Sequence, residues 1–188
     1  MDITQSTAYK IISNHGIAEM RQKISNGQNA LFTLRSYKAG DVVSDFWAGS
    51  ISAEPTYLTI QIGVRKHITM QPVFLQYINH SCDPNVFFDT TAMQVVALKD
   101  IRKEEELFFF YPSAEWKMAQ PFQCYCGNPC CLGEIKGAAY LPKHVPGSSQ
   151  DIPARIRSDP GAGTCRCNGG PMMRFRTHRD TLRARCRS

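Results

Sequence analysis

Residues 77–86 read Tyr-Ile-Asn-His-Ser-Cys-Asp-Pro-Asn-Val, and this stretch decides how the rest of the chain is interpreted. Its central positions, 79–85, bring together two amides, an imidazole, a thiol, a carboxylate and a proline. Because proline disfavours helix in the residue before it, the stretch predicts a turn that closes the apolar run 73–78. Such a turn can point Asn79 and His80 to one side and Cys82 to another. Taken alone, the pattern is equally compatible with a polar turn around a buried thiol.

Two later segments give this turn a context. Residues 104–111 read Glu-Glu-Glu-Leu-Phe-Phe-Phe-Tyr, and residues 122–133 read Phe-Gln-Cys-Tyr-Cys-Gly-Asn-Pro-Cys-Cys-Leu-Gly. Together, and in this order, the three segments resemble the SET-domain protein-lysine methyltransferases. The first matches the Asn-His-Ser-Cys-x-Pro-Asn signature of that family, the second its Glu-Glu-Leu-x-x-x-Tyr, and the third its post-SET Cys-x-Cys-x4-Cys-x-Gly. The resemblance covers about residues 27–140.

The resemblance implies a mainly β fold with short helices, namely the SET-domain fold of small curved sheets with a C-terminal pseudoknot and a post-SET zinc loop. In the pseudoknot, the strand ending at Tyr111 passes beneath the 79–85 loop, which brings Tyr111 close to Asn79. We expect four parts: an N-terminal packing segment (1–26), the SET domain (27–113), a post-SET zinc segment (114–142) and a basic tail (143–188). The Pro, Gly, Ser and Arg content of the tail favours disorder.

Composition limits the classes of protein. The chain has 188 residues, 43% of them hydrophobic, which is enough for one domain with a real core. It has no run of about 18 apolar residues, so we expect no membrane-spanning helix. Its first twenty residues lack the apolar stretch of a signal peptide, so we expect an intracellular protein, nuclear or cytoplasmic. The net charge of +6 comes from residues 141–188, which hold 10 Lys or Arg and 3 Asp or Glu. The globular part is therefore not a polybasic nucleic-acid binder.

Periodicity predicts the elements around these motifs. Apolar residues at helical spacing favour an amphipathic helix around residues 17–24. A strand follows Gly27, and a turn signal at 38–41 predicts a hairpin whose return strand covers 42–48. Further strands are expected at 57–63, 65–69, 92–98 and 107–111.

Methyl transfer from a sulfonium to an amine, the reaction that the resemblance implies, needs two separate pockets that meet end to end. The amine must be neutral, and holding a free lysine neutral at pH 7 costs roughly 4–5 kcal/mol because its pKa is near 10.4. A narrow apolar channel lowers that pKa by desolvation, and the aromatic run from Phe108 to Tyr111 suits such a channel. In a strand Phe109 and Tyr111 share one face, so we place them on the channel and Phe108 and Phe110 in the core. Without the other motifs, this run would be interpreted as a buried core strand.

By resemblance, Tyr111 is the catalytic tyrosine, whose hydroxyl orients the amine. Phe109 occupies a position where the family has either Phe or Tyr. Phenylalanine leaves room for an amine that is already methylated to rotate, so we predict that di- or trimethylation is possible.

The resemblance also implies the cofactor S-adenosylmethionine. Asn79 and His80 would bond its adenine and amino-acid ends, and Phe122 would pack on the adenine or close the lysine channel. SET domains carry a glycine-rich stretch just before the strand at 31–33; here Gly27 remains, while Asn29 and Ala30 stand where further glycines are expected. The cofactor-binding residues implied in this way are Asn29, Leu31, Tyr57, Asn79, His80 and Phe122.

Four cysteines are implied as ligands of a tetrahedral zinc ion. Cys124, Cys126 and Cys131 supply three thiolates, and Cys82 of the 79–85 turn completes the set. Cys130 could replace Cys131, although the Leu-Gly pair that follows favours Cys131. This zinc would hold the post-SET segment over the cofactor.

The sequence therefore predicts an S-adenosylmethionine-dependent transferase that acts on the ε-amine of lysine in a protein substrate, with histones among the candidate substrates. Two alternatives stay open. One is a SET fold with weak or no turnover that serves as a binding or scaffold module. The other is a zinc-stabilised nucleic-acid binder that depends on the tail, whose arginines would bind nucleic acid weakly and without sequence preference.

Overall fold

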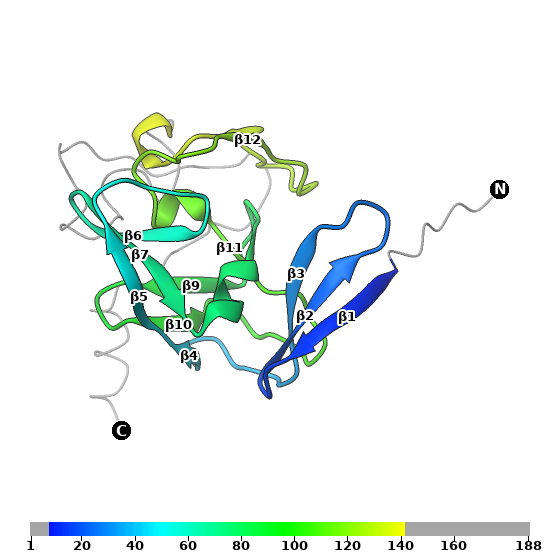
Figure 1. The fold of residues 1–188 in the computed structure, drawn as a ribbon. Coiled ribbons are helices and arrows are strands. Elements are labelled where there is room, and N and C mark those ends of the chain that lie inside the picture. The colour runs from blue at the N-terminus through cyan, green and yellow to red at the C-terminus, as the bar shows by residue number, and fades with distance from the viewer. Residues whose placement is uncertain (1–7, 142–188) are drawn as a thin grey trace, which may run out of the picture.

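The computed structural model describes residues 8–141, and in this part of the chain short strands dominate (Figure 1). The strands form three three-stranded sheets and two two-stranded ladders. The helices of residues 8–141 are three short 3-10 turns: η1 (Val73–Tyr77), η2 (Tyr111–Ser113) and η3 (Ala138–Tyr140). The prediction of a mainly β fold of small sheets with short helices is confirmed.

The N-terminal sheet has the order β1-β2-β3, with β1 (Tyr9–Asn14), β2 (Ala18–Lys23) and β3 (Asn29–Thr33) all antiparallel. The helix predicted around residues 17–24 is therefore wrong. Ala18 and Met20 are buried at alternate positions of β2, which is the period of a strand. A tight turn at Gly16, which has a φ of +79°, folds β1 against β2. Pairing on both edges satisfies the β2 backbone and outweighs the helical spacing of its apolar residues.

A second sheet has the order β4-β10-β9, built from β4 (Val42–Asp45), β10 (Gln94–Ala97) and β9 (Val86–Asp89). The turn predicted at 38–41 is present, since the amide of Asp41 donates to the carbonyl of Lys38 at 3.0 Å. The hairpin is wrong, however, because β4 pairs with β10 instead of β3. The predicted return strand 42–48 is divided at Phe46, and its second part starts another sheet.

This third sheet has the order β5-β7-β6, with β5 (Trp47–Ser52), β7 (Lys66–Gln71) and β6 (Thr59–Gly63). The strands predicted at 57–63, 65–69 and 92–98 are confirmed, with ends that differ by a few residues. The strand predicted at 107–111 is shorter. Only β11 (Phe108–Phe109) is extended, and η2 begins at Tyr111.

The remaining elements follow η2. The chain forms β12 (Phe122–Gln123) and returns as β13 (Glu134–Ile135), its antiparallel partner. Figure 1 shows this segment as a separate layer that lies across β11 from the β4-β10-β9 sheet. It therefore covers the region where the N-terminal sheet and β11 come together.

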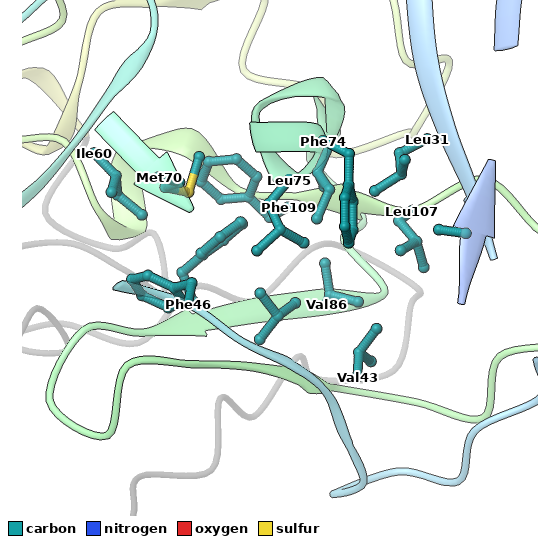
Figure 2. Close-up of a cluster of buried hydrophobic side chains, with 14 of the residues drawn as sticks. Leu31, Val43, Phe46, Ile60, Met70, Phe74, Leu75, Val86, Leu107 and Phe109 are labelled. Carbon is teal, nitrogen blue, oxygen red and sulfur yellow. The ribbon is translucent and has the colours of Figure 1, made fainter. Parts of the chain in front are cut away.

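Among the described residues, the main hydrophobic core joins the three three-stranded sheets, while Ile135 of β13 packs in a second cluster. Leu31, Ile68, Val95 and Leu107 are fully buried and come from four different strands or loops. Figure 2 shows how side chains from the N-terminal sheet, the central sheets and η1 converge on one volume, with Phe109 at its centre. Residues 8–141 contain no helix with the length and apolar character needed to cross a bilayer.

Candidate functional site

The 79–85 turn holds the strand that leads to Tyr111. Its strand β8 (Asn79–His80) pairs in parallel with β11, and the amide of Ser81 donates to the carbonyl of Phe109 at 3.2 Å. Asn85, from the far end of the turn, bonds both backbone groups of Phe108: its amide donates to the Phe108 carbonyl at 3.1 Å, and its Oδ1 accepts from the Phe108 amide at 2.8 Å. The near end of the loop thus bonds Phe109 and its far end bonds Phe108, so one short loop holds both residues of β11.

This arrangement brings Tyr111 beside β8, as predicted. The Tyr111 amide donates to His80 Nδ1 at 3.2 Å, and the Tyr111 hydroxyl donates to the carbonyl of Ile78 at 3.2 Å. Burial raises the pKa of Tyr111 to about 12, so its phenol is neutral at physiological pH. Because the phenol proton points at a backbone carbonyl, the oxygen keeps its lone pairs for another donor.

A cavity of about 1090 Å³ opens beside β8 and β11. It lies between the N-terminal sheet, the 79–85 turn and the segment that starts at β12. A single drug-sized ligand needs a cavity of about 300–1,000 Å³, so this one can accept a nucleotide-sized molecule. Its lining includes Tyr9, Lys23, Gln28, Ala30, Asn79, His80, Glu106, Phe108, Tyr111, Phe122 and residues 123–129.

Polar groups on the cavity wall are connected to one another. The Asn79 Nδ2 donates to the Asn29 carbonyl at 2.9 Å and to Glu106 Oε1 at 3.1 Å. The Tyr9 hydroxyl donates to Glu106 Oε2 at 3.4 Å. Burial raises the pKa of the Glu106 carboxyl. Sequence reasoning missed Glu106 and Tyr9 as cavity residues, although Glu106 lies inside the Glu-Glu-Leu motif that it quoted.

His80 is a neutral hydrogen-bond acceptor. Burial lowers the pKa of His80 to about 4, and Phe110, Tyr111 and Phe122 surround its ring with centroids 5.2–5.7 Å away. Its Nδ1 accepts the Tyr111 amide, which leaves the ring proton for Nε2. The ring therefore fixes the position of the Tyr111 backbone.

A smaller cavity of about 260 Å³ lies on the other side of Tyr111 and Phe122, which line both cavities. The two rings are 5.8 Å apart. The rest of the smaller cavity comes from β6 and the loop before it, from β7, from η1 and from the segment before β12. Those further lining residues are Thr56, Tyr57, Leu58, Thr59, Met70, Gln76, Glu115, Met118, Ala119, Gln120 and Pro121.

The alternation predicted for the aromatic run holds only in part. Phe109 is 8% exposed and lies in the main core, where its ring is 4.6 Å from that of Phe88 and 4.5 Å from that of Tyr111. Phe108, predicted to be core, instead lines the larger cavity, while Phe110 is buried as predicted. Strict alternation fails because the strand ends at Phe109. Phe109 therefore contacts the Tyr111 ring from the core side.

Of the six residues predicted to bind the cofactor, Asn79, His80 and Phe122 line the larger cavity. Asn29 does not line it, but the Asn29 carbonyl accepts a hydrogen bond from Nδ2 of Asn79, which does. Leu31 does not, because its side chain is fully buried in the core and its carbonyl accepts the Leu107 amide. Tyr57, with 73% of its surface exposed, lines the smaller cavity, which it shares with Phe122, and not the larger one.

The four predicted cysteine ligands do meet. The Sγ atoms of Cys82, Cys124, Cys126 and Cys131 all lie within 4.8 Å of one another. Zinc–thiolate bonds of about 2.3 Å around a tetrahedral ion require sulfurs this close. Ile135 of β13 packs against the cluster and shields it. The donor set therefore fits a metal ion that prefers thiolate ligands. Cys131, and not the alternative Cys130, is the fourth cysteine of the cluster.

Comparison with known proteins agrees with this geometry. A model of the SET domain family matches residues 27–112. A protein of Aspergillus flavus named methyltransferase flvH is 38% identical over 128 residues, which cover 67% of this chain and 65% of that protein. Two proteins named histone-lysine N-methyltransferase, H3 lysine-36 specific, from Schizosaccharomyces pombe and Saccharomyces cerevisiae, are 34% and 30% identical over 43% and 47% of this chain. The match covers only 11% and 14% of their length, so the chain spans less than two thirds of each of these relatives.

Among solved structures, the chain resembles a humanized mutant of the Chaetomium thermophilum Polycomb Repressive Complex 2 bound to the inhibitor GSK126. The match covers 71% of this chain and 20% of the chain in that structure. The identity of 20% and the TM-score of 0.39 are too low to support an argument. The residues that the family model matches include the turn at 79–85 and the strand β11 that this turn holds. Residues 27–112 of this chain are a SET domain.

Proposed function

We propose that this protein transfers a methyl group from S-adenosylmethionine to the ε-amine of lysine in a protein substrate. The observation that carries the proposal is the pair of cavities that share Tyr111 and Phe122. An in-line displacement needs a donor and an acceptor that approach from opposite sides of one point. The larger cavity is the donor site in this proposal, and the smaller cavity receives the amine.

The larger cavity suits the donor in size and chemistry. It combines the aromatic rings of Phe108 and Phe122 with amide and carboxyl groups at Asn79 and Glu106, as an adenosine joined to a charged amino acid requires. S-adenosylmethionine supplies, when bound, a methyl group on a positively charged sulfur. Asn79, His80 and Phe122 would hold it, and Asn29 would position Asn79.

Tyr111 is the proposed catalytic residue at the junction. Its hydroxyl proton is committed to the Ile78 carbonyl, so its oxygen can accept a hydrogen bond from the incoming amine. A neutral phenol also avoids trapping the amine in its charged form. The rings of Tyr111 and Phe122 exclude water from the same point, which favours a neutral amine.

Phe109 supports the Tyr111 ring and adds no hydroxyl of its own beside it. We therefore propose that the enzyme proceeds beyond monomethyl-lysine. The four-cysteine cluster is proposed to hold zinc, which would fix the segment 114–142 over both cavities as a post-SET unit. The relatives named H3 lysine-36 specific make histone H3 the first substrate to test.

The test is a transfer assay with S-adenosylmethionine that carries an isotopically labelled methyl group. The full chain is incubated with recombinant histone H3 and, separately, with a whole-cell protein extract, and peptides are analysed by mass spectrometry. We expect labelled di- or trimethyl-lysine. Binding of the cofactor without label in any protein, including the enzyme itself, would instead favour a binding or scaffold module.

A further inference from the structure

Glu115 is a buried carboxyl on the wall of the smaller cavity. The residue is 8% exposed. Its Oε1 accepts the backbone amide of Gln61 at 3.0 Å. Its Oε2 has no hydrogen-bond partner among the described residues. An unpartnered buried oxygen of this kind destabilises the fold, so we expect a ligand to complete its hydrogen bonding.

The position of Glu115 is fixed on both sides. Its carbonyl accepts the amide of Ala138 at 2.8 Å, and the next amide, that of Trp116, donates to Gln61 Oε1 at 2.9 Å. Gln61 thus holds the carboxyl through its backbone and the adjoining backbone through its side chain. These hydrogen bonds fix the position of Glu115, and within the described part of the chain Oε2 is left without a partner in that fixed position.

Few charged groups face this carboxyl. The nearest is His67 of β7, whose Nδ1 lies 4.0 Å from Oε2, beyond hydrogen-bond distance, and also has no partner in residues 8–141. Burial lowers the pKa of His67, an effect that the negative charge of Glu54 partly opposes. Tyr111 faces the same cavity from η2, and the described lining contains no Lys, Arg or Asp.

These features suit a proton acceptor for an amine. Met70, Met118 and Phe122 give the cavity largely apolar walls. An ammonium that enters loses hydrating water and is stabilised only by a negative charge nearby. Burial raises the pKa of Glu115 to about 8, which makes its carboxylate a stronger base than an ordinary one. The approach of a cation favours its ionised form.

We propose that Glu115 accepts the proton that the substrate ammonium must lose before methyl transfer. The N–H bond of the ammonium breaks and an O–H bond forms at Oε2, which leaves a neutral amine with a free lone pair and a neutral carboxylic acid. The acid then releases its proton to solvent through the open mouth of the cavity. The inference rests on the proposed function, because it assigns the smaller cavity to the amine.

The first test needs no turnover. The full chain, labelled with 13C at the glutamate side-chain carboxyl, is titrated with pH by NMR, and Glu115→Gln identifies the resonance. We expect a titration midpoint near pH 8 that falls clearly when n-butylamine is added, because the ammonium stabilises the carboxylate. Neither 1-butanol, which has no charge, nor tetramethylammonium, which has no N–H to donate, should reproduce the full shift. A midpoint that n-butylamine leaves unchanged, up to its solubility limit, would overturn the proposal.

The second test is kinetic. In Glu115→Gln we expect kcat/KM to fall by roughly 10²–10⁴-fold, with loss of the ionisation near pH 8 from its pH profile. Affinity for S-adenosylmethionine should not change, because Glu115 lies outside the larger cavity. Glu115→Asp should regain part of the rate.

A substrate peptide in which S-aminoethylcysteine replaces the target lysine adds a control that a purely structural role would not affect. Its amine is a weaker base, so it should lose less rate in Glu115→Gln than lysine does. The exposed carboxylate Glu54 provides a matched variant, Glu54→Gln, expected to retain the pH profile. An unaltered profile in active Glu115→Gln would refute the role of Glu115 alone. Absence of transfer by the native chain, with the NMR shift intact, would refute only the proposed function.

Discussion

Tyr111 owes its position to contacts with residues more than thirty positions away in the sequence. His80 Nδ1 fixes its backbone and the Ile78 carbonyl fixes its hydroxyl. Its ring is confined between Phe109 on the core side and Phe122 of β12 on the opposite side. A side chain held at both ends in this way can orient a ligand without first paying an entropy cost of its own.

Replacing Tyr111 with Phe removes the oxygen and leaves the ring. We expect the transfer rate at saturating substrate to fall by roughly 10²-fold or more, as for loss of a positioned polar group in a transition state. Cofactor affinity should change little. Stopped-assay kinetics with labelled cofactor measure both quantities. Tyr140→Phe, at an exposed tyrosine outside both cavities, is the matched control, and an equal loss in the two variants would contradict the role of Tyr111.

Phe109→Tyr tests the degree of methylation. The added hydroxyl would lie near the Tyr111 ring, whose centroid is 4.5 Å from that of Phe109, and would restrict rotation of a methylated amine. We expect the product distribution to move from di- and trimethyl-lysine toward monomethyl-lysine, as read by mass spectrometry. Because Phe109 is a core residue, the thermal unfolding temperature of the variant is measured alongside. A native product that stops at monomethyl-lysine would show the prediction to be wrong.

Glu115 should give the folded protein a distinctive pH dependence. An unfolded glutamate titrates near 4.3, whereas burial raises the pKa of Glu115 to about 8 in the fold. Between those values the folded state keeps a proton that the unfolded chain has released, so the free energy of unfolding falls as pH rises. The slope reaches about 1.4 kcal/mol per pH unit at most.

Urea unfolding of the native chain and Glu115→Gln measures this effect. The lowered pKa of His67 acts with the opposite sign below about pH 6.5, so the comparison belongs above that pH. There the native chain should lose stability up to about pH 8 while Glu115→Gln should follow a flatter curve. Parallel curves would rule out a protonated Glu115.

Sequence reasoning predicted the candidate site residues that lie inside contiguous motifs. Asn79, His80 and Tyr111 were predicted together because a motif fixes their local order, and family resemblance supplied their juxtaposition. Glu115 was missed because its environment depends on Gln61, 54 positions away, and on Ala138, and no local pattern signals that burial. The side chain of Leu31 lies in the core and that of Tyr57 lines the smaller cavity, and long-range packing decides these placements as well.

At the scale of elements, the segment 122–135, which runs from β12 to β13, depends on the cysteine cluster. Three of its four thiols come from residues 124–131, where β12 and β13 contribute only two residue pairs of ladder. A structural zinc can contribute about 10–16 kcal/mol to coupled folding, compared with about 5–15 kcal/mol for the stability of a whole domain. The cluster, more than the ladder, is expected to hold this segment in place.

Removal of the metal should therefore release the segment. After treatment with a strong chelator we expect a lower unfolding temperature, four additional thiols reactive toward a disulfide reagent, and loss of transfer activity. Zn²⁺ added back should reverse all three, and Mg²⁺ should not, because it prefers oxygen ligands. A chelated protein with unchanged unfolding temperature and thiol reactivity would exclude a bound metal.

Local patterns predicted strands well where both neighbours lie close in the chain. β6 and β7 form such a pair, with a short turn between them. Local patterns failed for β2, where Met20 fits a helical spacing and a strand alternation equally. Only pairing with β1 and β3 decides between the two. Local patterns failed again for β4, whose partner β10 lies about fifty residues downstream. Long-range pairing outweighs local propensity in both cases.

At the scale of the whole molecule, the described fold places both cavities within residues 8–141. The basic segment 143–188, predicted from its composition to be disordered, lies outside the described residues. A chain truncated after residue 142 should therefore keep its transfer rate on a small peptide within about twofold, consistent with surface changes that leave stability nearly unaltered. The measurement is kcat/KM on that peptide.

Nucleic-acid affinity gives the contrasting readout. If the arginines of the segment bind nucleic acid, the native chain should show weak, salt-sensitive binding that the truncated chain lacks. Loss of transfer activity on truncation would favour the alternative in which the tail carries the function. Order and connection of sheets at this scale were not predictable from the sequence, because non-consecutive strands such as β4 and β9 share a sheet through β10.

Tyr111 and Phe122 form a wall between the two cavities. Ligand binding in one cavity and ligand binding in the other therefore depend on the same two side chains. Any occupant that displaces the Phe122 ring from one side alters the affinity on the opposite side. Thermodynamic reciprocity then requires the second occupant to change the affinity of the first by the same factor. Titrating each ligand in the presence of the other would reveal that cross-talk as a pair of equal ratios.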